Sequence, residues 1–123
     1  MFDLVIVHAY QDLPLASGLG ETFASQGLEV GEGVSIWPSD RITQRVRRGL
    51  DGARAAVILV TEEFARMPWP RRDLDALADH DRVVALLCGI EEEDVAGLSP
   101  RLAVAAIPGC HHEQVVRLLR FDG

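Results

Sequence analysis

Lysine is absent from the sequence, so all twelve of its strongly basic residues are arginines. Acidic residues outnumber them at nineteen, which gives the chain a formal net charge of −7. Non-specific nucleic-acid binding needs a basic surface, so this balance argues against a nucleic-acid partner. No apolar run approaches the roughly 18 residues of a membrane-spanning helix, and no basic segment followed by a long apolar one opens the chain. We expect no membrane partner and no signal peptide.

Cysteine is scarce, and Cys88 and Cys110 stand far apart without a Cys-x-x-Cys motif. They predict buried thiols of a reduced compartment, and hence a cytoplasmic protein, rather than a disulfide framework. Residues 110–113 (CHHE) are of metal-ligating types. Neighbouring residues do not converge on one ion, however, and no second cluster accompanies them, so we expect no metal. The nucleophile elbow of serine hydrolases and the P-loop are missing as well.

With 123 residues, of which 48% are hydrophobic, the chain has the size of one domain, residues 1–123, with a substantial core. The segments between its apolar runs are mostly amphipathic and predict helices, whereas the acidic residues 90–99 predict a loop. Helices that connect nearly continuous apolar strands are typical of a parallel sheet covered on both faces, so the expected class is α/β. The apolar runs predict five strands, near residues 2–7, 28–31, 54–60, 82–88 and 102–107.

Ligands of parallel sheets bind outside the carboxyl ends of the strands. His8 and Ala9 follow the first predicted strand, where an imidazole suits either a binding site or an ordinary polar loop contact. Residues 31–39 follow the second strand, but their Gly-x-Gly lacks the third glycine of a dinucleotide-binding fingerprint. Trp37 in this loop suits exposed recognition and closure of its own loop equally well. The helix predicted next, residues 41–52, exposes several arginines.

Residues 69–77 (WPRRDLDAL) open a helix beyond the third strand. Pro70 suits a first helical turn, and Asp73 sits where the positive end of the helix dipole favours a carboxylate. Leu74 begins the apolar face, so Asp73 is expected at the edge of the packing, partly desolvated. Trp69, two arginines and this carboxylate can together serve a small-molecule site. The same residues also fit a solvated helix start with a tryptophan anchor.

Five parts of the chain match the motifs of a known family. Residues 2–12 (FDLVIVHAYQD) resemble YDVFISYASED, and residues 38–40 (PSD) resemble the PGD that ends the family's BB loop. Residues 48–50 (RGL) with 57–61 (VILVT) resemble EGL…VVVLS, residues 69–77 resemble WPKKELDAL, and residues 93–103 resemble EDV…SPxLA. In order and at suitable spacing over nearly the whole chain, these motifs are similar to those of the bacterial-type Toll/interleukin receptor (TIR) domain.

The resemblance implies a flavodoxin-like TIR fold with a five-stranded parallel sheet. It also implies self-association with other TIR domains, as a homo-oligomer or filament, through the BB loop (Trp37, Pro38, Ser39 and Asp40) and the helix after it. Many bacterial members cleave NAD⁺, which is then a substrate and not a cofactor. The essential glutamate of such enzymes corresponds to Asp73, which is the candidate catalytic residue. His8, Ala9 and Trp69 are the candidate NAD-binding residues.

The sequence departs from the family pattern at three places. Val7 replaces a serine, residues 31–34 (GEGV) replace an aromatic–acidic WFDE, and Asp73 replaces the glutamate. Asp is shorter by one methylene, and a misplacement of that size can lower a rate about 100-fold. We therefore expect a signalling module of a prokaryotic immune system, such as antiphage defence, that self-associates and has weak or absent NAD⁺ cleavage. The alternative is an active NAD⁺ nucleosidase or ADP-ribose cyclase that uses Asp73 in place of the glutamate.

Overall fold

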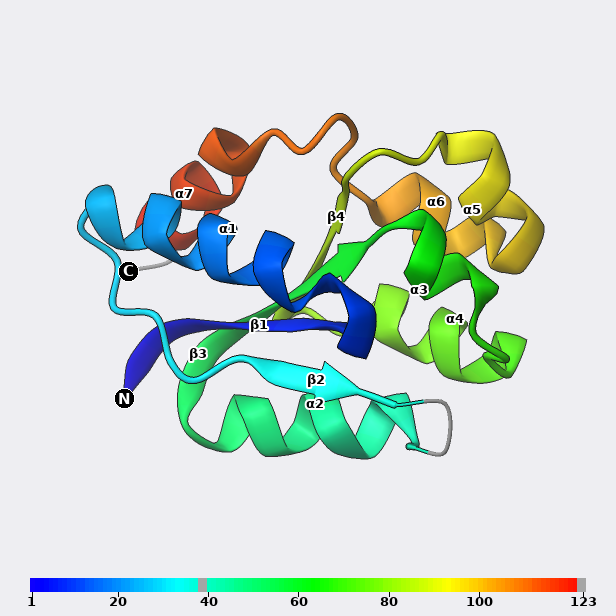
Figure 1. Ribbon diagram of the computed structural model, residues 1–123, viewed down its shortest axis with the longest axis horizontal. Helices are drawn as coiled ribbons and strands as arrows, with labels where there is room; N and C mark the ends of the chain where they lie inside the picture. Colours follow the sequence, from blue (N-terminus) through cyan, green and yellow to red (C-terminus); the bar gives the residue numbers. More distant parts are fainter. Residues whose placement is uncertain (38–39, 122–123) are drawn as a thin grey trace.

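The computed structural model describes residues 1–37 and 40–121, of which 120 and 121 by their backbone alone. Helices cover both faces of a central sheet (Figure 1). The strands are β1 (Phe2–Ala9), β2 (Val34–Ile36), β3 (Ala53–Val60) and β4 (Val83–Leu87). The helices are the 3₁₀ turn η1 (Tyr10–Asp12), α1 (Leu13–Ser25), α2 (Ile42–Asp51), α3 (Glu62–Arg66), α4 (Arg71–Asp79), α5 (Glu92–Leu98), α6 (Pro100–Ala105) and α7 (His112–Phe121).

The strands lie in the order β2-β1-β3-β4, and each pair is parallel. The predicted α/β class with a parallel sheet and helices on both faces is therefore confirmed, and it is consistent with a flavodoxin-like TIR fold. The strand count is wrong: within the described residues the sheet has four strands instead of five.

The second strand was expected at residues 28–31 and lies instead at β2. Of the expected segment, Val30 alone forms a bridge, with Leu4. At Gly31 the backbone lies very close to β1. A Cβ on this residue would lie 2.9 Å from side-chain atoms of Phe2 and Val5. Beyond this crossing, β2 pairs with the carboxyl-terminal end of β1, in the register Val7↔Val34, His8↔Ser35 and Ala9↔Ile36.

The fifth strand, expected at residues 102–107, is mostly helix α6. Ser99 accepts a hydrogen bond from the backbone N–H of Leu102, and Pro100 occupies the first helical turn, so the residues start a helix. Ile107 alone reaches the sheet, where it bridges Leu86. The acidic segment expected as a loop contains α5, since three carboxylates in its first turn complement the helix dipole.

Alternate residues of β1 point to two separate cores. Val5, Val7 and Ala9 pack with α2, α3, α4 and α6 on one face. Leu4 and Ile6 pack with α1 and α7 on the other. Figure 1 shows α1 and α7 above the sheet and α2 below it. None of the described helices is both long and apolar enough to span a membrane.

Cys88 and Cys110 form a disulfide, so the expectation of two separate thiols is wrong. The bond joins the end of β4 to the turn before α7. Pairing of Ile107 with β4 brings this turn to the strand, and the backbone N–H of Cys110 donates to Leu87. The neighbouring Glu113 is exposed, and a hydrogen bond from its own backbone N–H, aided by His111 and His112, lowers the pKa of its carboxyl.

Candidate functional site

The strand order changes direction between β1 and β3. The chain leaves β1 for α1 on one face of the sheet and leaves β3 for α3 and α4 on the other, which makes this the expected binding crevice. Figure 1 shows the ends of β1 and β2 and the connection from α3 to α4 at the same side of the molecule. A short hydrogen bond spans the crevice, from the Thr61 hydroxyl to the buried carboxylate of Asp12, at 2.5 Å.

Asp73 lies in the first turn of α4 and is half-buried. Its backbone N–H donates to Pro70, at 3.0 Å, while the next residue, Leu74, is fully buried in the core. Within residues 1–37 and 40–121, no hydrogen bond or ion pair engages the Asp73 carboxylate. The first turn of α4 thus presents a partly desolvated carboxylate that a ligand can contact. The positive end of the helix dipole stabilises the negative charge of this carboxylate.

Trp69 is fixed just before this helix. Its indole N–H donates to the backbone oxygen of Phe64, at 2.6 Å, and the two rings lie 4.8 Å apart. The side chain remains half-buried. Trp69 therefore anchors the connection between α3 and α4, as one interpretation of the sequence expects, and its part in a ligand site stays a prediction.

His8 and Ala9 point to opposite faces of the sheet. Ala9 is buried in the core that also contains Leu74, on the face of the sheet that Asp73 shares. The side chain of His8 is 1% exposed and lies on the side of α1, beside Ile6. The structure therefore brings Ala9 and α4 to one face and leaves the His8 imidazole on the other. The NAD-binding role of these residues stays a prediction.

Trp37, which follows β2, is 53% exposed and stacks on Tyr10 with ring centroids 4.3 Å apart. Its backbone N–H donates to the Asp40 carboxylate, at 2.9 Å, and that carboxylate lies 3.7 Å from Nε of Arg45 on α2. This network holds the ends of the BB loop. The Pro38 and Ser39 of the predicted self-association surface lie outside the described residues.

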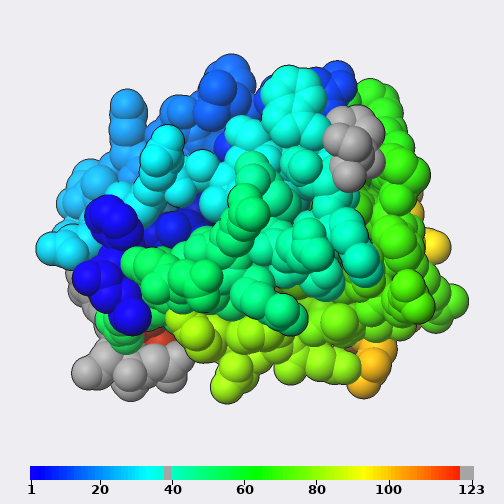
Figure 2. Space-filling model, turned by 90° about the horizontal axis from the view of Figure 1, so that it is seen from below, coloured from blue at the N-terminus to red at the C-terminus, as the bar shows by residue number. Residues whose placement is uncertain are grey.

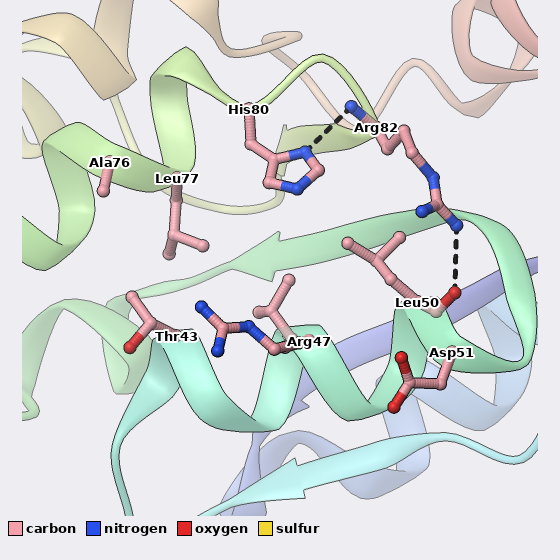
Figure 3. Close-up of a pocket in the computed structure, with 9 residues that line it drawn as sticks. Thr43, Arg47, Leu50, Asp51, Ala76, Leu77, His80 and Arg82 are labelled. Carbon is pink, nitrogen blue, oxygen red and sulfur yellow. Dashed lines mark hydrogen bonds between the residues drawn. The ribbon is translucent and has the colours of Figure 1, made fainter.

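Helix α2 runs across the face of the molecule seen in Figure 2, with α4 beside it. A cavity of about 260 Å³ lies between the two helices. Figure 3 shows its apolar floor, with Leu50 and Leu77, and a rim that carries Arg47, His80 and Arg82. The Arg82 guanidinium stabilises the fold, since it donates hydrogen bonds to the backbone oxygens of residues 50, 53 and 54. Helix α2, which is part of the predicted self-association surface, forms one wall of this cavity, and neither Asp73 nor Trp69 lines it.

No group of three or more metal-ligating side chains gathers anywhere in the described part of the chain. In the CHHE segment, the sulfur of Cys110 is bonded to Cys88 and is not a free ligand.

Sequence reasoning missed two features of this region. The first is the stacking of Trp37 on Tyr10, which was not predicted. Ser35, 3.4 Å from the imidazole of His8, was hidden because the second strand was placed too early. The correct register, with His8 opposite Ser35, would have predicted the pair.

Comparison with curated proteins found related sequences, although no family model matches the chain. The NAD(+) hydrolase PdTIR of Paracoccus denitrificans is 26% identical over 82% of this chain and 36% of its own length. The NAD(+) hydrolase TcpA of a Theionarchaea archaeon is 25% identical over 97% of the chain and 40% of its own length. The 2′ cyclic ADP-D-ribose synthase AbTIR of Acinetobacter baumannii is 26% identical over 83% of the chain and 40% of its own length.

The chain thus spans well under half the length of the curated relatives it matches. Each match nevertheless covers most of the chain itself, in proteins from both bacteria and archaea. Together with the parallel α/β fold and the five motifs in order, these matches support a bacterial-type Toll/interleukin receptor (TIR) domain.

Proposed function

We propose that this TIR domain is a prokaryotic immune or signalling module that self-associates and cleaves NAD⁺ slowly, with Asp73 as the catalytic carboxylate. The observation that carries the proposal is the half-buried carboxylate of Asp73, which has no partner within the described residues. The names of the relatives, two NAD(+) hydrolases and a cyclic ADP-ribose synthase, support NAD⁺ as the substrate.

The chemistry needs one well-placed carboxylate. Breaking the bond between nicotinamide and ribose builds positive charge on the ribose ring, and a neighbouring carboxylate stabilises that charge. The nicotinamide nitrogen is cationic in NAD⁺ and becomes neutral as it takes the bonding electrons, so it needs no proton from a second acid. Water then adds to the ribose carbon and releases a proton, which gives ADP-ribose. NAD⁺ is consumed, and no cofactor enters the reaction.

Slow turnover follows from the position of the carboxylate. The side chain of Asp73 is shorter than a glutamate by one methylene, a loss of reach of about 1 Å that can lower a rate about 100-fold. The WFDE segment of the family is replaced by residues 31–34, in which Glu32 and Gly33 are exposed and offer no aromatic ring for stacking. The alternative, an active nucleosidase, requires that the chain close around Asp73 despite these changes.

The test measures nicotinamide release from NAD⁺ by chromatography, at high protein concentration. We expect Asp73→Glu to raise turnover about tenfold or more, because it restores the reach of the carboxylate, and Asp73→Asn to abolish it. Asp79→Asn is the matched control, because this acid lies on the same helix and pairs with Arg101 on the surface, at 3.0 Å. Undiminished activity of Asp73→Asn would show that another group is catalytic.

The partner in this proposal is a second TIR domain of the same kind. Trp37 and Asp40 at the BB loop, with the exposed arginines of α2, form the proposed contact surface, since tryptophan and arginine dominate interface hot spots. We propose the cytoplasm as the location, where NAD⁺ is available. Disulfides are rare there, so the redox state of the Cys88–Cys110 pair in cells is a direct check on this part of the proposal.

A further inference from the structure

The cavity between α2 and α4 has a floor of core side chains (Figure 3). Val46, Leu50 and Leu77 form this floor and are only 2%, 7% and 4% exposed. The short side chains of Thr43 and Ala76 also line the cavity, which leaves room between the two helices. Its volume of about 260 Å³ is just below the roughly 300–1,000 Å³ of sites for drug-sized ligands. The cavity therefore suits a smaller organic molecule.

Two arginines at this cavity carry positive charges that no carboxylate of the described residues neutralises. The Arg82 guanidinium donates only to backbone oxygens, which are uncharged. Arg47 lines the cavity and forms no hydrogen bond or ion pair within residues 1–37 and 40–121. Because arginine stays protonated in proteins, both charges are permanent. In a chain with a net charge of −7, they make the cavity a local positive site.

Asp51 is the one acidic side chain among the described residues that line the cavity. It lies one helical turn after Arg47 on α2, yet no ion pair joins the two side chains. Figure 3 shows the Arg47 side chain directed toward Thr43 and away from Asp51. The end of the cavity at Arg47 therefore keeps its positive charge, and a negatively charged group of a ligand fits at that end.

His80, at the end of α4, adds a hydrogen-bond donor across the cavity from α2 (Figure 3). Its Nδ1 accepts a hydrogen bond from the backbone N–H of Arg82, at 3.1 Å, and lies 3.6 Å from the carboxylate of Asp81, which is outside the cavity. An imidazole that accepts at Nδ1 carries its proton at Nε2, and a doubly protonated imidazole carries protons at both nitrogens. Nε2 is thus a donor whatever the charge of the ring, and none of the described residues accepts from it.

We propose that the cavity between α2 and α4 binds a small organic carboxylate. The carboxylate group lies between the Arg47 guanidinium and Nε2 of His80, and the apolar part of the ligand packs on Leu50 and Leu77. The planar guanidinium forms two parallel hydrogen bonds with a carboxylate, which are stronger than bonds between neutral groups. An apolar body alone would leave both donors without a partner.

The proposal does not rest on NAD⁺ cleavage, because neither Asp73 nor Trp69 lines this cavity. Arg47 is also one of the α2 arginines in the proposed contact between domains, so a bound carboxylate and a second domain compete for it. Binding is therefore measured at protein concentrations at which light scattering shows a monomer. Loss of cleavage in Asp73→Asn leaves carboxylate binding intact, and failure of carboxylate binding leaves the proposed cleavage and self-association standing.

The test titrates ¹⁵N-labelled protein with benzoate and with benzamide, which has the same ring and no charge. Benzoate is expected to shift the signals of Arg47 Nε and His80 Nε2 along a saturable curve. Arg47→Met keeps an apolar side chain, removes the charge and should weaken benzoate binding at least about tenfold. Arg48→Met is the matched control, because Arg48 is also exposed on α2 and does not line the cavity. Ala76→Leu fills the cavity without a change of charge and should weaken binding as well.

Four results would each overturn the proposal. The first is the absence of a saturable shift up to about 10 mM benzoate, a concentration that would reveal even very weak binding. The second is an equal shift of the same signals by benzamide. The third is an equal affinity of Arg47→Met and Arg48→Met for benzoate. The fourth is undiminished binding in Ala76→Leu, which would show that benzoate contacts arginines outside the cavity.

Discussion

At the scale of single residues, two buried hydroxyls hold helix starts to neighbouring carboxylates. Thr61 caps α3 and binds Asp12, while Ser99 caps α6 and binds Asp75, both with donor–acceptor distances of 2.5 Å. Each hydroxyl satisfies a backbone N–H at the helix start and donates its own proton to a carboxylate. These side chains join segments that lie far apart in the sequence.

We predict that Ser99→Ala lowers the free energy of unfolding by about 2 kcal/mol, because it leaves the Leu102 N–H and the Asp75 carboxylate without this partner. Urea denaturation monitored by circular dichroism measures the change. Ser17→Ala, at an exposed position inside α1, is the control and should be close to neutral. A loss below about 0.5 kcal/mol in Ser99→Ala would mean that water replaces the hydroxyl at both partners.

The sequence allowed part of the candidate site to be predicted. The position of Asp73 in a first helical turn beside buried Leu74 follows from local spacing and is confirmed. The direction of the His8 side chain could not be found in the same way. The neighbours of this side chain depend on which residue of β2 pairs with His8. Successive side chains of a strand point to opposite faces, so a strand placed at the wrong residues gives the wrong neighbours on both faces.

At the scale of elements, the strands β1, β3 and β4 were predicted, whereas β2, α5 and α6 were not. Residues 55–60 of β3 are a continuous apolar run, and this run alone predicts a buried strand. Residues 102–107 are also apolar, but Ser99 and Pro100 begin a helix whose apolar face packs on the core. Apolar composition alone does not separate a buried strand from a buried helix in runs this short.

The disulfide between Cys88 and Cys110 joins β4 to the turn before α7 across a sequence separation of 22 residues. In the chain-entropy account, a cross-link of a loop of this length stabilises a domain by about 3 kcal/mol. We predict that dithiothreitol lowers the free energy of unfolding by about this amount. Cys88→Ser/Cys110→Ser should equal the reduced protein and show no response to reductant. Equal urea midpoints for wild type with and without dithiothreitol would contradict the prediction.

At the scale of the whole molecule, the two faces of the sheet carry different candidate functional groups. The α4 face carries Asp73 and continues into α2 and the BB loop, where the proposed contact between domains lies. The α1 face carries the buried side chain of His8 and a cavity of about 450 Å³ between α1 and residues 30–35. This division follows from a single feature of the topology, the change of direction between β1 and β3, which sends consecutive helices to opposite sides. An assembly built on the α2 side therefore leaves the α1 cavity open.

Trp37 is the residue on which we expect that assembly to depend most. Its ring is 53% exposed and is held flat against Tyr10, so it meets a partner without further ordering. Trp37→Ala should weaken self-association at least about 30-fold, the effect of a hot spot of about 2 kcal/mol, as measured by light scattering over a range of concentrations. The melting temperature should fall only slightly, because within one domain the substitution removes only the stacking of Trp37 on Tyr10, which contributes about 1 kcal/mol.

The control is Leu118→Ala, which removes an exposed apolar side chain from α7, outside the proposed surface, and should leave assembly unchanged. If Trp37→Ala assembles like the wild type, the ring serves only to close its own loop over Tyr10, and the contact between domains lies elsewhere.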